Sequence, residues 1–406
     1  KKKKKVLIMS EIRVTNVLGE NGNSPVNFTK GINMSGIVTA TSFVPTVGQL
    51  SHRNKIINGA CNIAQRGVSA TSVSGQYKTV DRFSVNYSGE DEDPTEAQHT
   101  LSTSDTPYTL GFRKSFHITN GNQTSGAGAA DYVQPQYKIE AQDIANSGWN
   151  YTDSNSFITL SFWVKASVAG DYTLNMNTHD GTPYRYLMEY SLLANTWKHV
   201  VFKIPGNSNL TVNNDNGLGL QIMWYPFLGS NYIQADQENN WYASSNGKYG
   251  TVSTTNWWTT NDATWEITGV QLEVGSVATP FEHRSFGHEL SLCQRYYEHS
   301  YNDANYPGGN HNTGGYYAGH SADGSNNATW SALFAVRKRA VPTVTYYTDS
   351  GTSGQWNYIR SGASGTATMT YFRNSQTFVG GYLGAGGGAA YNGVTIWGHW
   401  TASAEL

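Results

Sequence analysis

A strict two-residue alternation of side chains is the feature that most constrains the fold. In residues 158–165 every second residue is a large apolar one, and residues 172–176 repeat the pattern. Successive side chains of a strand point to opposite faces, so this alternation gives a strand with one buried and one solvated face. Such strands are typical of antiparallel sheets, and we therefore expect an all-β core.

Further strand-like stretches and turn residues extend this prediction along the chain. The 43 glycines and an aromatic content of 13% suit many short strands joined by tight turns, and they fit neither a helical bundle nor a disordered chain. Seven or more strands separated by Gly, Asn and Asp predict a jelly-roll-like β-sandwich over residues 51–285. The further strands are expected at residues 115–119, 184–190, 198–204, 218–224 and 265–274.

The pattern changes to helical spacing at Phe286, with Ser285 available as N-cap. This predicts one short helix in a linker of residues 286–300. A long loop rich in Gly and Asn is expected over residues 301–329. Strands resume beyond it and predict a second, smaller β-sandwich, so that residues 301–406 form a C-terminal unit. Residues 384–390 are expected to form a loop within it.

Residues 1–50 contain short β-prone stretches with too few apolar groups to bury them. We expect an attachment or trimerisation segment that folds against other subunits or a partner; the alternative is a flexible tail. Five lysines precede only about three apolar residues, whereas a signal peptide needs about 7–15, so secretion is not expected. The origin of this lysine run is left open.

Charge, hydropathy and cysteine content exclude several classes of partner. The net charge is −2, and without the five opening lysines it is 22 − 29 = −7. Clustered Lys and Arg are needed to bind phosphates, so nucleic acid is not an expected partner. No run approaches the roughly 18 apolar residues of a membrane span, so membrane insertion is not expected. Cys61 and Cys293 lie far apart among apolar neighbours and predict buried free thiols.

Several stretches resemble a module of structural proteins from tailed phages of marine and freshwater bacteria. The longest is ITGVQLEVGSVATPFEHRS at residues 267–285, and the module's opening is NKIINGACNIAQRG at residues 54–67. Shorter matches support these two, at residues 80–83, 120–128 and 142–149. Residues 288–297, 336–345 and 401–406 look like a tail-fibre C-terminal module. The resemblance covers roughly residues 51–300 well, and it implies a carbohydrate-binding-module-like sandwich on a tail fibre, spike or related virion appendage.

No stretch supplies a recognisable set of catalytic residues, so the chain is not expected to be an enzyme. The acidic run of residues 90–93 is crowded on one turn, whereas glycoside hydrolysis needs carboxylates facing each other across a cleft. His283 and His288 lack the i, i+4 spacing of a helical zinc site. No cofactor is expected, and the metal content is left unknown. Loop carboxylates could hold a structural calcium, and the candidates are Asp131, Asp180 and Asp262.

Aromatic residues in polar, turn-rich sequence are the best functional signal. Sugar rings stack their C–H faces on Trp and Tyr, while polar side chains bond the hydroxyls. The candidate glycan-binding residues are Trp241, Tyr242, Tyr249, Trp257, Trp258, Tyr316, Tyr317 and Trp356. The alternative for each ring is packing inside its own loop or at a subunit interface. By contrast Trp163, Trp197, Trp224 and Trp265 sit within strand patterns and are predicted to be core or sheet-face residues.

Together these observations favour a homotrimeric tail-fibre or spike subunit, located in the virion after assembly in the host cytoplasm. We expect the N-terminal segment to dock on other virion proteins, and the aromatic loops to bind host-surface polysaccharide. On this interpretation the C-terminal unit of residues 301–406 is the candidate receptor-binding tip. One alternative is a capsid decoration or head-fibre protein with the same modules. The second alternative is a polysaccharide depolymerase. The sequence does not distinguish these appendages or identify the glycan, the docking partner or the copy number.

Overall fold

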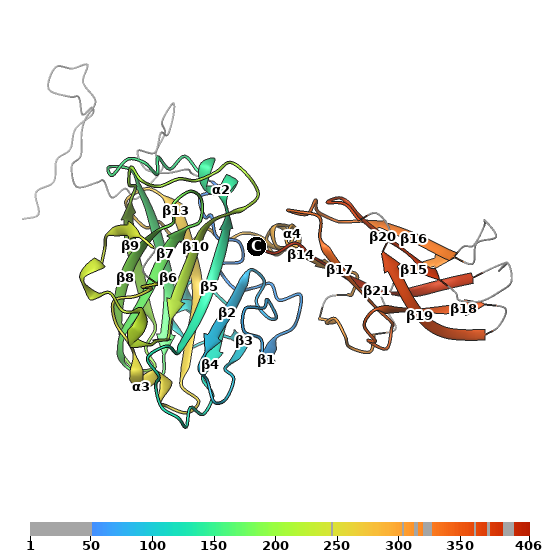
Figure 1. The fold of residues 1–406 in the computed structure, drawn as a ribbon, viewed down its shortest axis with the longest axis horizontal. Helices are drawn as coiled ribbons and strands as arrows, with labels where there is room; N and C mark the ends of the chain where they lie inside the picture. The colour runs from blue at the N-terminus through green and yellow to red at the C-terminus, as the bar shows by residue number, and fades with distance from the viewer. Residues whose placement is uncertain are drawn as a thin grey trace, which may run out of the picture. The chain divides into compact units, whose positions relative to one another are not determined.

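The computed structural model describes residues 51–406 apart from residues 245–246, 303, 312–315, 320–326, 361–362, 372–373 and 385–393. The predicted attachment segment of residues 1–50 lies outside the described residues, as does most of the loop predicted at 384–390. The described chain is all-β apart from short helices, which confirms the predicted fold class (Figure 1). No helix within the described residues is long and apolar enough to span a membrane.

Two antiparallel sheets pack face to face and form the first sandwich (Figure 1). The six-stranded sheet has the order β1 (Ser69–Thr71), β3 (Thr95–Thr100), β4 (Lys114–Thr119), β13 (Thr264–Val274), β6 (Phe157–Ala166), β9 (Lys198–Pro205). The seven-stranded sheet has the order β11 (Phe227–Leu228), β5 (Tyr132–Glu140), β10 (Leu218–Tyr225), β7 (Gly170–Thr178), β8 (Tyr184–Leu192), β12 (Trp241–Ala243), with β2 (Phe83–Ser88) also paired to β5.

The core between these sheets follows from the alternation seen in the sequence. The alternating apolar residues of the predicted strand 158–165, which are Ile158, Leu160, Phe162 and Val164, are fully buried, and the same holds for Tyr172, Leu174 and Met176 in β7. Trp224 and Trp265, predicted as core or sheet-face residues, are fully buried, and the Trp224 ring meets Phe162 edge-on at 5.8 Å between centroids. Large aromatic groups each bury about 150–250 Å² and dominate the stabilisation of such a core.

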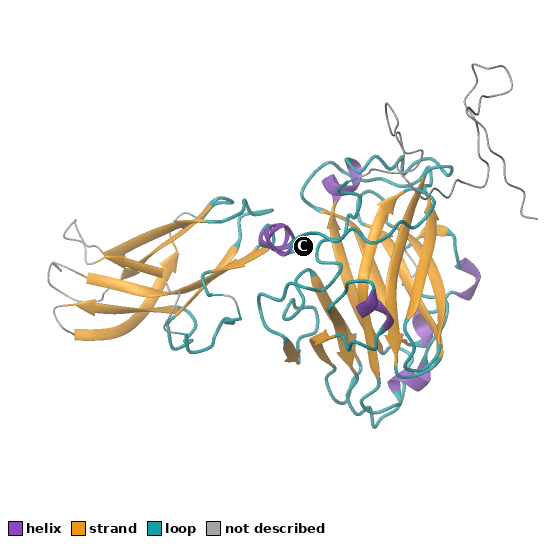
Figure 2. Ribbon diagram, turned by 180° about the vertical axis from the view of Figure 1, so that it is seen from behind, coloured by secondary structure: helices purple, strands orange, loops and turns teal. Residues whose placement is uncertain are grey.

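Short helices connect the strands, as Figure 2 shows. They are α1 (Thr106–Thr109), α2 (Ala141–Ala145), α3 (Thr255–Trp258) and α4 (Phe286–Gln294), with 3₁₀ turns η1 (Ser230–Tyr232) and η2 (Ala235–Gln237). The predicted linking helix is α4, and its N-cap is Ser285, whose hydroxyl accepts a hydrogen bond from the backbone N–H of His288. Cys61 and Cys293 are buried free thiols, as predicted.

The C-terminal strands form one hydrogen-bonded set of eight around β21 (Val394–Ser403). The first part of β21 pairs with β15 and β18, and its second part pairs with β14 and β17. A separate core contains Trp330, Tyr346 and Trp356. The strands are β14 (Tyr297–His299), β15 (Tyr316–Gly319), β16 (Asn327–Leu333), β17 (Thr343–Tyr347), β18 (Gln355–Arg360), β19 (Ala363–Tyr371) and β20 (Phe378–Gly384).

A buried ionic contact joins residues far apart in the sequence. Glu405 pairs with Arg66 at 3.0 Å and also with Arg82, whose side chain is 1% exposed. The Arg82 guanidinium lies 3.4 Å from the centroid of the Tyr296 ring. Because a buried charge is costly without a partner, Arg82 depends on the Glu405 carboxylate, whereas Arg66 also has the Asp81 carboxylate at 3.7 Å.

Candidate functional site

The structure places all four predicted glycan-binding tryptophans in hydrophobic cores. Trp257 and Trp258 are fully buried in α3, and their indole N–H groups donate to the carbonyl oxygens of Thr264 and Gly126. These two residues therefore cannot stack on a ligand in this structure. The prediction failed here because the polar sequence around them was interpreted as a loop, whereas a single helical turn inserts both rings into the sandwich.

Trp241 and Trp356 also require correction. Trp241 in β12 is 6% exposed, packs against the Tyr186 ring at 5.2 Å, and donates its indole N–H to the Pro205 carbonyl. Trp356 is fully buried in β18, with the Trp330 ring 4.4 Å away. Each indole has its polar N–H bonded and its rings covered, so both are core residues.

The predicted tyrosines are placed differently. Tyr242 is partly buried, and its hydroxyl donates to the Lys248 carbonyl at 2.7 Å. Tyr249 is also partly buried, with the Arg185 guanidinium 4.1 Å from its ring centroid. Both rings therefore make contacts within the protein, in the segment that covers the outer face of the seven-stranded sheet. Tyr316 and Tyr317 lie in β15, paired with β21, but their side chains fall outside the described part of the structure.

Among the loop carboxylates singled out in the sequence, those of Asp91, Asp131 and Asp180 accept hydrogen bonds from neighbouring backbone N–H groups. The Asp91 carboxylate accepts a hydrogen bond from the Ser125 backbone N–H at 2.6 Å, so the acidic turn anchors a neighbouring loop. The calcium candidates Asp131, Asp180 and Asp262 lie on three separate turns. None of these three aspartates belongs to a group of three or more metal-ligating side chains in the part of the chain that the structure describes.

An aromatic cavity of about 380 Å³ opens on the outer face of the six-stranded sheet. We call it the Trp163 cavity. Its floor is formed by side chains of β6 and β9 and by Gly269 in a bulge of β13, and its walls by the loops that follow α1 and β13. The lining residues are Leu110, Phe112, Ser161, Trp163, His199, Gly269, Thr279, Pro280, Phe281 and His283. Its volume lies within the range of about 300–1,000 Å³ that is typical of small-molecule sites.

Strand register explains how the aromatic floor is built. Trp163 and His199 are directly opposite each other on β6 and β9, and their rings stack 5.0 Å apart with 27° between planes. On the neighbouring side Phe112 meets Phe281 edge-on at 4.9 Å. Gly269 has φ +62°, and a Cβ there would come within 2.7 Å of the Phe112 ring. The bulge glycine is therefore needed for the ring to approach the strand.

The cavity combines apolar rings with polar groups available for hydrogen bonding. Trp163 and Phe281 are partly exposed, and His199 and His283 are exposed. In the residues that the structure describes, the Ser161 hydroxyl and the His199 ring have no hydrogen bond within the protein. A ligand with apolar faces and hydroxyl edges could thus find both kinds of contact here.

Charged and aromatic side chains continue this surface beyond the cavity. The Trp197 indole N–H donates to the Asp105 carboxylate at 2.7 Å, and the Lys165 ammonium lies 4.9 Å from the Trp197 ring centroid. Lys165 also pairs with Asp105 at 3.3 Å. Trp163 and Trp197 were predicted as core or sheet-face residues; Trp163 lies on the outer face of β6, and Trp197 is partly buried immediately before β9. The sequence could have indicated that Trp163 faces outward, because Trp163 occupies one of the alternating positions that are otherwise polar.

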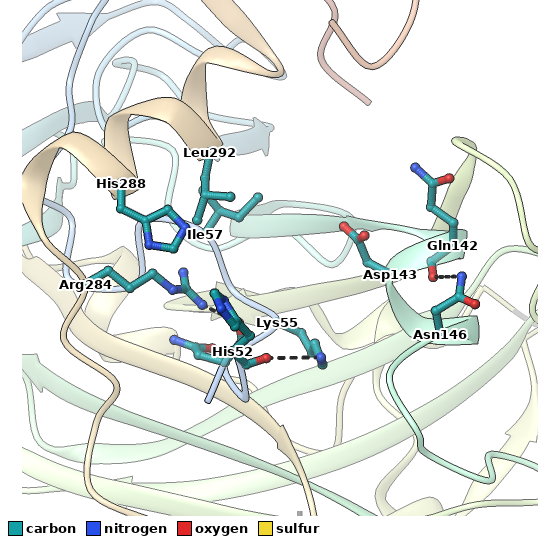
Figure 3. A pocket seen from close by; sticks show the side chains of 10 residues that line it. His52, Lys55, Ile57, Gln142, Asp143, Asn146, Arg284, His288 and Leu292 are labelled. Carbon is teal, nitrogen blue, oxygen red and sulfur yellow. Dashed lines mark hydrogen bonds between the residues drawn. The ribbon is translucent and has the colours of Figure 1, made fainter. Parts of the chain in front are cut away.

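A second, more polar pocket of about 360 Å³ lies between residues 52–57, α2 and α4 (Figure 3). Figure 3 shows His288 and Leu292 on one side and Asp143 across from them. Arg284 is bonded within the wall, with ion pairs to Glu282 and Glu289. With its guanidinium occupied and few apolar groups in its lining, this pocket offers less for ring stacking than the Trp163 cavity.

Comparisons with known proteins give no family assignment. No family model matches the chain, and none of the curated proteins matches it. Solved structures with weak similarity include a putative sugar binding protein from Bacteroides thetaiotaomicron, 12% identical, covering 55% of this chain and all of that one, with a TM-score of 0.29. The N-terminal cellulose-binding domain of a Cellulomonas fimi β-1,4-glucanase is 12% identical, with 53% and 100% coverage and a TM-score of 0.26.

A family 11 carbohydrate-binding module of a cellulosomal cellulase from Clostridium thermocellum is 11% identical, with 53% and 98% coverage and a TM-score of 0.25. Likeness at this level carries no argument about function. The fold description above therefore rests on the strands and cores of the chain itself.

Proposed function

We propose that this protein is a non-enzymatic binding protein that holds a carbohydrate in the Trp163 cavity. The observation that supports the proposal is a partly exposed indole in the floor of an open 380 Å³ cavity, next to a hydroxyl and imidazoles. The C–H face of a sugar ring would stack on Trp163, and its hydroxyls would bond Ser161 and His199. No aspartate or glutamate is among the residues lining the cavity, which favours binding over glycoside hydrolysis.

One such site would be weak. A stacked ring contributes on the order of 1 kcal/mol, by analogy with aromatic pairs. Several copies of the site on one particle would strengthen attachment through avidity, without any tighter single contact. A multivalent assembly is therefore the setting in which this cavity would be useful.

We further propose that this setting is a phage virion, where the chain serves as a homotrimeric tail-fibre or spike subunit that adheres to host-surface polysaccharide. The proposal is supported by the resemblance of residues 54–67 and 267–285 to phage structural modules. Residues 1–50 would provide docking on other virion proteins. A capsid decoration would use the same binding site, and immunogold labelling of intact particles would distinguish the two positions.

The binding site is tested by replacing one ring of the cavity. We expect Trp163→Ala to lower the affinity of the full chain for envelope polysaccharide about fivefold, which corresponds to about 1 kcal/mol, and Trp163→Phe to lower it less. The control is Leu193→Ala, which removes an exposed apolar side chain outside the cavity and should bind normally. Binding is measured by biolayer interferometry, with melting temperatures to confirm folding. A folded Trp163→Ala protein that binds normally would refute the site, and release of reducing ends by the wild-type protein would revive the depolymerase.

A further inference from the structure

Three metal-ligating side chains meet on the outer face of the six-stranded sheet, outside the lining of the Trp163 cavity. His99, His117 and Glu266 come from β3, β4 and β13, which are neighbours in the sheet. His117 and Glu266 are directly paired across β4 and β13, and His99 lies on the next strand, opposite Ser115. The register of three strands therefore brings together residues separated by up to 167 positions in sequence.

The distances suit one metal ion. The Glu266 Oε2 atom lies 3.2 Å from His99 Nδ1 and 3.6 Å from His117 Nδ1. All three residues place a ligand atom within 4.8 Å of the others. A tetrahedral zinc ion with bonds of about 2.0–2.1 Å separates its ligand atoms by about 3.3–3.4 Å. The two measured separations lie on either side of that value.

Neighbouring side chains bind both oxygens of the Glu266 carboxylate. The Lys165 ammonium pairs with Glu266 Oε1 at 2.8 Å and thereby occupies that oxygen. The Ser115 hydroxyl donates to Oε2 at 2.8 Å, and His99 Nδ1 is hydrogen-bonded to the same oxygen at 3.2 Å, so a metal at this oxygen would replace the His99–Glu266 hydrogen bond. Such hydrogen bonds orient ligating carboxylates in metal sites. With neutral imidazoles, Glu266, Asp105 and Lys165 sum to a charge of −1, which favours a cation.

One histidine of the cluster has a ring nitrogen that makes no hydrogen bond to the described residues. The Nδ1 atom of His117 is buried and has no hydrogen-bond partner among the described residues. Its ring centroid is 5.0 Å from that of His99, so two protonated rings would repel each other. A metal bound between the rings would satisfy His117 and require both imidazoles to be neutral.

We propose that His99, His117 and Glu266 form a binding site for a divalent cation of the zinc type. Two imidazoles and one carboxylate oxygen are ligands that Zn²⁺ accepts, and water would supply the fourth. The ion would link β3, β4 and β13. His99 is about half exposed, so the ion can enter from solvent. This inference is independent of glycan binding.

The test uses the full chain, treated with a chelator and dialysed, and titrated with ZnCl₂ or CoCl₂ at neutral pH. We expect one equivalent to bind, Co²⁺ to show the strong visible absorption of tetrahedral coordination, and the melting temperature to rise with Zn²⁺ concentration. His99→Ala and His117→Ala should each weaken binding at least tenfold and remove the Co²⁺ spectrum. The control His288→Ala, an exposed histidine in α4 outside the cluster, should bind like the wild type.

His99→Ala removes a half-exposed side chain and is expected to fold, so a loss of binding there is not a consequence of unfolding. Absence of saturable binding by the wild type would overturn the proposal. Unchanged stoichiometry and affinity in both histidine variants would also overturn it, because the metal would then bind elsewhere.

Discussion

A buried carboxyl group should make the stability of this protein fall as pH rises through neutrality. Glu96 in β3 is fully buried and accepts a hydrogen bond from the Thr79 hydroxyl at 3.0 Å on one oxygen, while its other oxygen has no partner among the described residues. Burial raises the pKa of Glu96 to about 8 from its ordinary value of 4.5. The carboxyl group is therefore protonated in the folded protein at neutral pH.

The sign and size of the effect follow from proton linkage. Between pH 4.5 and 8 the folded state holds a proton at Glu96 that the unfolded state has lost, so the free energy of unfolding falls as pH rises. The slope is about 1.4 kcal/mol per pH unit. The full difference across this window is about 4–5 kcal/mol as an upper bound. The stabilising contribution is complete below pH 4.5 and lost above about pH 8.

The test variant is Glu96→Gln, which keeps the shape of the side chain but has no carboxyl group to titrate. Urea unfolding at pH 5, 6, 7, 8 and 9 gives the difference in stability between variant and wild type at each pH. We expect that difference to shift in favour of the variant by several kcal/mol between pH 5 and pH 9. Glu238→Gln, at an exposed position, is the control. A Glu96→Gln difference that is constant with pH would refute the reasoning.

Three further perturbations test the packing. Trp257→Ala combined with Trp258→Ala should lower the free energy of unfolding by about 3–5 kcal/mol or more, measured by urea unfolding; an unchanged value would mean that the rings are not core residues. Glu405→Gln should cost about 3–5 kcal/mol by leaving Arg82 buried without its partner, and thermal unfolding would detect this. Gly269→Ala should weaken glycan binding by displacing the cavity wall, and normal binding would contradict the assigned geometry.

The regular part of the fold was predictable because its signals are local. Alternation over residues 158–165 indicated β6 and its buried face, and the same reasoning placed Trp224 and Trp265. The N-cap Ser285 and the helical spacing after it indicated α4. In each case a run of neighbouring residues carried the whole pattern, and tertiary contacts did not change it.

The candidate sites were less predictable because they depend on register and on short elements. A helix as short as α3 leaves no periodicity to detect, so Trp257 and Trp258 were assigned to a loop surface when they fill the core. The cluster of His99, His117 and Glu266 exists only once β3, β4 and β13 pair in one register. No spacing within the sequence indicates that pairing.

The contact between Arg82 and Glu405 has a consequence for synthesis of the chain on the ribosome. The two residues are 323 positions apart, so at about 5–20 residues per second Glu405 is added roughly 16–65 seconds after Arg82. Throughout that interval the guanidinium lacks its carboxylate. Within the first sandwich Arg82 has the Lys138 carbonyl as an acceptor, and we expect it to become fully buried only after residues 401–406 have emerged from the exit tunnel.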